Sequence, residues 1–199
     1  MTLALFDFDG TLTRKDSFPA FLTFMLGATG FAKALIKASP TIVAWKYGRA
    51  TNQQAKEALL SAALKGKSQS TIEQAGQAFA ERCLPKLLRP QAEALLQKHQ
   101  ALEHETLLVS ASPDAWMNPI AKKLHIKLIS SRLAYKEGVF LGKLQGKNCY
   151  GQEKVERIKQ ALSLDQYSRI YAYGDSRGDK EMLELASHPR YQTLILPES

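Results

Sequence analysis

From residue 90 onward, short apolar segments alternate with helical ones, and this alternation limits the possible fold more than any other feature of the chain. Strand-like segments cover residues 3–8, 106–112, 126–135, 169–176 and 191–197, and helical patterns cover residues 90–102, 113–124, 151–162 and 179–186. Strands that alternate with helices are typical of a parallel sheet with helices on both faces. The sequence therefore predicts an α/β protein with a doubly wound parallel sheet.

A long helical stretch interrupts this pattern after the first strand. Residues 17–84 are rich in Ala, Leu, Lys and Gln, and we expect breaks in their helical periodicity at Ser39-Pro40, Gly48 and Gly66. We expect these residues to form a small helical cap domain. The cap is inserted into a core made of residues 1–16 and 85–199.

Polar residues follow the predicted strands at the points where the strands end. Asp7 and Asp9 follow the first strand, Ser110 follows another, and Asp175 and Asp179 follow a third. In a doubly wound sheet, ligands bind outside the carboxyl ends of the strands. We therefore expect these side chains to converge at one edge of the sheet.

The segment DFDGT, residues 7–11, places two carboxylates directly after an apolar strand. A buried ionised carboxylate is costly without a cation or hydrogen-bond donors. An EF-hand calcium loop is excluded because Leu12 and Phe18 stand where Gly and Glu are required. A nucleotide P-loop is excluded too, since residues 142–148 have the wrong spacing and no hydroxyl. Two solvated turn carboxylates remain as the structural alternative.

The charge of the chain is concentrated in one segment. Of the net +8, seven charges fall between Arg14 and Lys67, where nine Lys and Arg face two acids. Such a segment suits nucleic acid, an anionic membrane surface or an anionic substrate, and a solvated lysine-rich helix is the simpler alternative. The uncharged stretch 17–32 is short and interrupted for a membrane-spanning helix, and we expect no cleaved signal peptide. Two cysteines do not make a disulfide framework, so a reducing, cytoplasmic location is expected.

Four motifs together resemble the haloacid dehalogenase superfamily of phosphohydrolases, and within it the phosphoserine-phosphatase-like branch. They are LFDFDGTL at residues 5–12, LLVSAS at 107–112, YGQEKVERI with Lys154 at 150–158, and YGDSRGD at 173–179. Residues 131–154 also resemble the hairpin that leads to the catalytic lysine in that branch. The resemblance covers residues 1–16 and 85–199.

This resemblance implies a Mg²⁺-dependent phosphatase that works through an aspartyl-phosphate intermediate. Asp7 is the expected nucleophile and Asp9 the general acid and base. Asp7, Asp175 and the backbone carbonyl of Asp9 are the expected metal ligands. The groups expected to hold the phosphate or support the site are the Ser110 and Lys154 side chains, the backbone of Gly10 and Thr11, and the carboxylate of Asp179. Ser112 is an alternative to Ser110, because either hydroxyl can cap the following helix.

The resemblance weakens in the cap. Asp16 stands where phosphoserine phosphatases have a glutamate that binds the substrate amino group, and a residue near Leu59 stands where they have an arginine for its carboxylate. A leucine cannot pair a carboxylate, which argues against phosphoserine as the substrate. The aromatic, apolar run at residues 17–31 resembles the cap region of bacterial phosphatidylglycerophosphate phosphatases, although packing within the cap also explains it.

Two functions from different classes follow from these observations. The first is a phosphatase acting on a small phosphorylated metabolite or on a lipid phosphate, in the cytoplasm or peripheral to the inner face of the membrane. The second is a nucleic-acid-binding or membrane-binding protein with a silent core. The complete set of motif residues argues against the second, and we expect no nucleic-acid partner.

Overall fold

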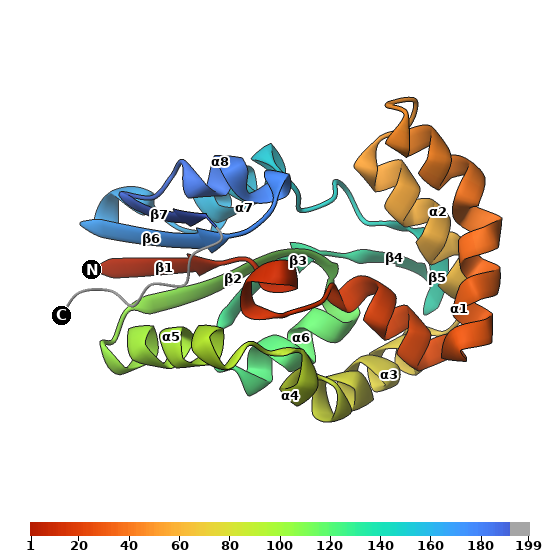
Figure 1. Ribbon diagram of the computed structural model, residues 1–199, viewed down its shortest axis with the longest axis horizontal. Coiled ribbons are helices and arrows are strands. Elements are labelled where there is room, and N and C mark those ends of the chain that lie inside the picture. Colours follow the sequence, from red (N-terminus) through yellow and green to blue (C-terminus); the bar gives the residue numbers. More distant parts are fainter. Residues whose placement is uncertain (192–199) are drawn as a thin grey trace.

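The computed structural model describes residues 1–191, and its centre is a five-stranded parallel sheet. The sheet has the order β3-β2-β1-β6-β7, with bounds Lys127–Ser131, Glu105–Pro113, Thr2–Phe6, Arg169–Gly174 and His188–Tyr191 (Figure 1). β1, which comes first in the chain, lies between β2 and β6. This arrangement confirms the predicted α/β class and parallel sheet. The strand predicted at residues 191–197 lies, apart from Tyr191, outside the described residues.

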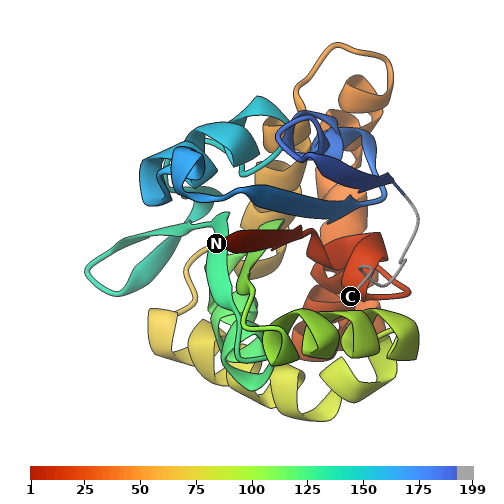
Figure 2. The ribbon, with the colours of Figure 1, turned by 90° about the vertical axis from the view of Figure 1, so that its left-hand side faces the viewer.

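Helices cover both faces of the sheet (Figures 1 and 2). One face carries α5 (Pro90–Ala101) and α6 (Asp114–Lys123), and the other carries α7 (Gln152–Ala161) and α8 (Lys180–Leu183). Successive side chains of a strand point to opposite faces, and both faces of β1 are apolar. Ala4 and Phe6 join the core on the α5 side, whereas Leu3 and Leu5 join the core on the α7 side. The apolar run LALF is therefore buried on both faces.

The segment predicted as one strand at residues 126–135 is two strands in the structure. β3 ends at Ser131 and joins the main sheet, and β4 (Leu133–Lys136) pairs instead with β5 (Val139–Leu144) in a separate antiparallel hairpin. The chain turns between Lys136 and Val139, which pair across the hairpin. The backbone amide of Leu133 donates to Asp114 at the start of α6, which redirects the chain between the two sheets.

The helical stretch after β1 forms α1 (Ser17–Lys46), α2 (Asn52–Leu64), α3 (Gln69–Arg82) and α4 (Leu84–Leu87). The expected break at Ser39-Pro40 does not occur. Proline lacks the amide that would bond the carbonyl of Ile36, and the hydroxyl of Ser39 donates to that carbonyl instead, at 2.8 Å. The helix therefore continues to Lys46, with an interruption at Gly27.

The four helices make two kinds of contact. α1 and α2 pack on each other and α2 packs on β5, away from the main sheet (Figure 1). α3 packs closely on α6 of the core, where a Cβ on Gly76 would lie 2.0 Å from the carbonyl oxygen of Ala115. The division into a core of residues 1–16 and 85–199 and a cap of residues 17–84 stays a prediction.

Candidate active site

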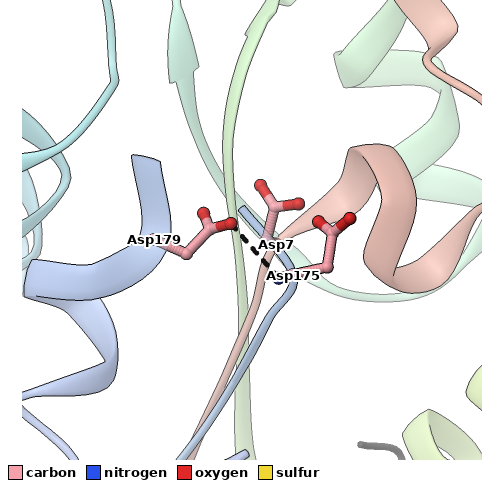
Figure 3. Close-up of side chains that lie close together, drawn as sticks. All are labelled: Asp7, Asp175 and Asp179. Atoms are coloured by element: carbon pink, nitrogen blue, oxygen red, sulfur yellow. Dashed lines mark hydrogen bonds between the residues drawn. The ribbon is translucent and has the colours of Figure 1, made fainter. Parts of the chain in front are cut away.

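Three carboxylates meet at the carboxyl ends of β1 and β6. Asp7 follows β1, Asp175 follows β6, and Asp179 lies one turn further on (Figure 3). One oxygen from each carboxylate lies within 4.8 Å of the other two. Asp7 and Asp179 are buried and Asp175 is half-buried. β1 and β6 are neighbouring parallel strands, so their carboxyl ends bring residues 168 positions apart in the chain into one cluster.

Lys154 supplies the positive charge next to this cluster. It lies near the start of α7 and its ammonium group is fully enclosed. Nζ donates to Oδ1 of Asp7 at 2.6 Å, to Oδ1 of Asp179 at 2.6 Å and to the carbonyl oxygen of Val109 at 2.7 Å. All three donors of the ammonium group are therefore used, and they join β1, β2 and the segment after β6.

Burial and charge act on these groups in opposite directions. Burial raises the pKa of Asp7 to about 8, although the charge of Lys154 acts to lower it. Burial also acts on Asp179, but the charge of Lys154 and the hydrogen bonds from Lys154 and Ser176 hold its pKa below the ordinary value. Burial acts to lower the pKa of Lys154, and the charges of Asp7 and Asp179 overcome it and raise the pKa. The cluster therefore combines a firmly charged ammonium group with the carboxyl group of Asp7, whose ionised form is disfavoured by burial.

The donor set fits a divalent cation. Three carboxylates and one ammonium group leave two negative charges when all are ionised, and the ligand atoms are oxygens, which hard cations such as Mg²⁺ prefer. Space for close approach comes from Gly10, whose φ is +87°. A Cβ at Gly10 would lie 2.2 Å from Oδ2 of Asp175. The hydroxyl of Thr11 donates to Oδ1 of Asp175 at 3.2 Å, so the DFDGT turn also orients that carboxylate.

Asp9 points to a different set of partners. Its Oδ1 accepts from the backbone amide of Ser17 at 2.6 Å, and its Oδ2 accepts from the hydroxyl of Ser112 at 2.6 Å. Burial and then the charge of Asp16 raise its pKa, against these hydrogen bonds. The hydroxyl of Ser17 accepts in turn from Nε1 of Trp116 at 3.2 Å. The second carboxylate of the motif is thus held between the start of α1 and the end of β2.

The two serines of VSAS have separate surroundings. Ser110 is fully buried and its hydroxyl accepts from the backbone amide of Ser112 at 3.0 Å. Ser112 holds Asp9 and lines the cavity beside it. Asp16 is exposed and caps α1, accepting from the amide of Phe18 at 2.8 Å. Lys154, Asp175 and Asp179 therefore lie around Asp7, next to the turn at Gly10 and Thr11, while Asp9 and Asp16 face the cap. Ser110 is buried in β2 and is not among the residues that line the cavity.

A cavity of about 350 Å³ lies between the cluster and the cap. Its core side includes Asp7, Asp9 and Lys154. Its cap side is mainly apolar and is formed by residues of α1 and α2, namely Phe18, Ile42, Trp45, Ala55 and Leu59. A larger hollow of about 1230 Å³ lies along the edge strand β3 and contains none of the clustered carboxylates. The smaller cavity is therefore the one that the carboxylates and Lys154 serve.

Sequence reasoning missed two contributors to this cavity. Ser112 was weighed only as an alternative to Ser110, and nothing in the sequence indicated a bond to Asp9. Lys56 lines the cavity from α2, where burial lowers its pKa to about 8 against the raising effect of Asp9 and Asp16. Lys56 lies one helical turn before Leu59, which stands near the position where phosphoserine phosphatases have an arginine. A single lysine in a lysine-rich helix carries no signal that it is buried.

Comparison with known proteins gives a family for this arrangement. The family model of haloacid dehalogenase-like hydrolases matches residues 4–184. Protein CicA of Caulobacter vibrioides is 38% identical over 192 residues, which cover 96% of this chain and 85% of the relative. A histidinol-phosphatase of Neisseria meningitidis is 25% identical over 201 residues, which cover 94% and 88%.

Solved structures share the fold over nearly the whole chain. A protein with unknown function from Bordetella pertussis has a TM-score of 0.79 at 27% identity, with 94% of this chain and 87% of that chain covered. A phosphoserine phosphatase with an analogue of the phospho-aspartyl intermediate has a TM-score of 0.66 at 21% identity, with 92% and 82% covered. At 21% identity, the similarity to this phosphoserine phosphatase shows a shared fold.

Proposed function

This chain belongs to the haloacid dehalogenase-like hydrolases, and we propose that it is a Mg²⁺-dependent phosphomonoester hydrolase that forms an aspartyl-phosphate on Asp7. The observation that carries the proposal is the buried cluster of Asp7, Asp175 and Asp179 around the ammonium group of Lys154. A structural ion pair needs one carboxylate for each cation. The excess of carboxylates at the mouth of a cavity suits a site for a metal and a phosphate.

Asp7, Asp175 and the backbone carbonyl of Asp9 would hold the metal. When bound, Mg²⁺ supplies positive charge that stabilises the phosphoryl oxygens. The same neutralisation offsets the cost of keeping Asp7 and Asp175 close together. The space beside Gly10 and the oxygen donors of the cluster support this assignment.

Asp7 and Asp9 have different roles in the proposed reaction. An oxygen of Asp7 attacks phosphorus, the bond between phosphorus and the ester oxygen breaks, and Asp9 gives its proton to the leaving alkoxide. Asp9 then removes a proton from water, which attacks the aspartyl-phosphate and releases inorganic phosphate and free Asp7. The bonds from Ser17 and Ser112 to Asp9 support a fixed direction for this proton transfer.

The remaining polar groups bind or support the phosphoryl group. In this proposal a phosphoryl oxygen replaces Asp7 as an acceptor of Lys154, and the hydroxyl of Ser110 and the backbone amides of Gly10 and Thr11 hold the other oxygens. Asp179 positions Lys154, and its 2.6 Å contact with Nζ supports that role. Asp16 lies toward the leaving group, where its exposed carboxylate faces the cap.

Turnover of p-nitrophenyl phosphate with Mg²⁺ tests the proposal. Wild type hydrolyses the ester, and EDTA abolishes the activity until Mg²⁺ is restored. Asp7→Asn keeps the shape of the side chain but removes the nucleophile, so turnover falls at least about a thousandfold, ~4 kcal/mol of barrier. Activity within tenfold of wild type, measured after removal of contaminating phosphatases, would refute the assignment. No turnover in wild type would favour the silent-core alternative, a protein that only binds nucleic acid or membrane.

The substrate is a small phosphorylated metabolite or a lipid phosphate, and one observation favours a membrane as the site of action. Ile36, Val43 and Tyr47 are exposed, and their spacing places them on one face of α1. Lys33 and Lys37 lie beside this face and are exposed. α1 is also long and apolar enough to cross a membrane. Its most apolar stretch of 18 residues has a mean hydropathy of 1.4, and 17% of that stretch is buried within the protein. We propose a cytoplasmic protein whose α1 face lies on the inner membrane surface.

Co-sedimentation with phosphatidylglycerol vesicles tests the membrane location. Basic residues near an anionic surface contribute ~1 kcal/mol each, and the exposed apolar side chains of α1 add to this. Binding is expected at low salt, weaker binding at moderate salt, and loss of binding for Lys33→Glu/Lys37→Glu. Lys122→Glu/Lys123→Glu, on exposed positions of α6, is the matched control with the same change in charge. Protein that stays in the supernatant at both salt concentrations, with efficient hydrolysis of a small ester, refutes the membrane location.

A further inference from the structure

Lys56 is a half-buried cation on the cap side of the cavity, and it forms no ion pair with a carboxylate of the described residues. Its Nζ donates to the carbonyl oxygen of Ala111 at 2.8 Å and to Oδ1 of Asn148 at 3.0 Å. Within the described part of the chain, none of the ion pairs includes Lys56. Both hydrogen-bond partners are neutral. The ring of Phe18, 5.7 Å from Nζ, and the charges of Asp9 and Asp16 offset only part of the cost of burial, because the pKa of Lys56 is still lowered to about 8.

Withdrawing an ammonium group from water without an ion pair opposes folding. Neutral oxygen acceptors compensate only part of the lost hydration. The walls around Lys56 are largely apolar, with Phe18, Ala55 and Leu59 lining the same cavity. An apolar side chain of similar length would fill that space without the penalty. The cation is therefore costly for the fold, as expected of a group that binds a ligand.

The position of Lys56 is determined by contacts on both sides. Asn148, which accepts from Lys56, also accepts from the hydroxyl of Ser131 at 2.9 Å and donates to Oδ1 of Asn52 at 2.7 Å. Ala111, the other acceptor, lies between the two serines of VSAS. The ammonium group of Lys56 is thus held between α2, the last residues of β2 and the segment before α7. Two of its three N–H donors have partners in the structure, which leaves one for a ligand.

In the proposed function, the substrate lies in the cavity that the ammonium group of Lys56 lines. The phosphoryl group lies at Asp7, and the leaving alcohol lies past Asp9 toward the cap, where Lys56 lines the same cavity. Asp16 is a charge of opposite sign near the same end, but it is exposed and its Oδ1 caps α1. Water screens an exposed charge far more than a buried one. Lys56 therefore supplies positive charge to the cap side of the cavity, where Asp9 is the nearest buried carboxyl group named among the charges that act on it.

We propose that Lys56 is a specificity-determining residue that binds a second anionic group, carboxylate or phosphate, on the alcohol part of the substrate. This inference rests on the phosphatase function proposed above and narrows its substrate class. Phosphomonoesters with a second negative charge close to the ester are preferred over neutral ones, and cationic alcohols are disfavoured. The ligand would place an anionic group in direct contact with Lys56, which none of the ion pairs of the described residues does.

The test compares esters that differ mainly in this charge. Ethyl phosphate is neutral in its alcohol part, phosphoglycolate carries a carboxylate, propane-1,3-diol bisphosphate carries a second phosphate, and phosphoethanolamine carries an ammonium group. For wild type, kcat/KM is expected to be at least about tenfold higher for the better of the two anionic esters than for ethyl phosphate, and lowest for phosphoethanolamine. Which anionic ester leads identifies the group that is bound.

Three variants separate specificity from structure. Lys56→Met removes the charge and is expected to reduce the anionic-to-neutral ratio of kcat/KM to about one, whereas Lys56→Arg retains part of the preference. Lys65→Met, at the exposed end of the same helix, is the control and keeps the wild-type ratio. If Lys56 only held the cap to the core, Lys56→Met would lower kcat/KM equally for all esters and leave the ratio unchanged, which would overturn the proposal. A wild type without preference for either anionic ester would overturn it too.

Binding measurements distinguish failure of this inference from failure of the proposed function. Calorimetry of Asp7→Asn with phosphoglycolate, propane-1,3-diol bisphosphate and ethyl phosphate measures recognition without turnover. At least tenfold tighter binding of one anionic ester, lost in Asp7→Asn/Lys56→Met, supports the role of Lys56 whether or not wild type is an active phosphatase. Equal affinity for all three esters overturns it.

Discussion

Replacing Lys154 by methionine should destabilise the protein more than any other single removal of a charge. Methionine is similar in length and removes only the ammonium group and its hydrogen bonds. In the structure Nζ lies 2.6 Å from an oxygen of Asp7, 2.6 Å from an oxygen of Asp179 and 2.7 Å from the carbonyl of Val109. Both carboxylates are buried, so the variant leaves two neighbouring negative charges without their shared cation.

The expected loss is about 3–5 kcal/mol in the free energy of unfolding, the range observed when one member of a buried ion pair is removed. A domain of ordinary stability, about 5–15 kcal/mol, stays folded under this loss but unfolds at a lower urea concentration. Urea titrations followed by circular dichroism in EDTA measure it, because bound metal would otherwise stabilise the site. Lys159→Met, exposed on the same helix α7, is the control and changes stability by less than about 0.5 kcal/mol.

A second substitution tests the assigned cause. Asp7→Asn removes one of the two charges left by Lys154→Met, so the double variant should be more stable than the sum of the single changes predicts, by about 1–3 kcal/mol. Additive effects would show that Asp7 and Lys154 do not interact as the 2.6 Å distance implies. A loss below about 1 kcal/mol for Lys154→Met alone would refute the claim that this cation compensates buried carboxylates.

Three further predictions concern the turn, the acid and a buried histidine. Gly10→Ala should lower kcat/KM at least about a hundredfold, ~2.7 kcal/mol, because the new Cβ would lie 2.2 Å from Oδ2 of Asp175. Gly48→Ala, at a similar φ but with open space around the Cβ, is the control. Equal activity of the two variants would contradict the steric argument. Asp9→Asn should slow hydrolysis of ethyl phosphate more than that of p-nitrophenyl phosphate, whose leaving group needs no proton, and equal losses on both would exclude the acid role. Burial and the charges of His104 and Lys98 lower the pKa of His99 to about 4 from 6.5, so the folded state resists protonation. The contribution of neutral His99 to stability is present above pH 6.5 and is lost as the pH falls toward 4, up to about 3 kcal/mol. Urea titrations at several pH values in this range measure the free energy of unfolding, which should depend less steeply on pH in His99→Gln than in wild type. The same pH dependence in both proteins would rule out this histidine as the cause.

Local patterns predicted the elements that carry the chemistry. The apolar run before Asp7 identified a strand buried on both faces, and the later alternation identified the parallel sheet. Once the sheet is parallel, its strands end at one edge, and this places Asp7 and Asp175 together without knowledge of any long-range contact. Ser110, expected just after its strand, lies within β2 instead. Their individual roles stay predictions, because geometry alone does not assign a step to a carboxylate.

Elements whose ends depend on distant residues were predicted less well. The segment 126–135 has continuous strand character, and its division into β3 and β4 depends on Asp114, which binds the amide of Leu133. α1 passes through Pro40 because Ser39 supplies the missing hydrogen bond to Ile36. In both places a single side-chain contact outweighs the local signal.

The sequence by itself determined the sheet, the order of its motifs and the set of acidic and basic residues at one edge, because strand periodicity and parallel topology are encoded locally. Only the tertiary structure decided which polar residues became buried partners. Ser112 turned toward Asp9, and Lys56 of α2 reached the same cavity as Lys154. Burial changes the free energy of a charge by several kcal/mol, yet it arises from contacts between segments far apart in the chain, and a lysine in a helix looks the same in sequence whether it faces water or a substrate.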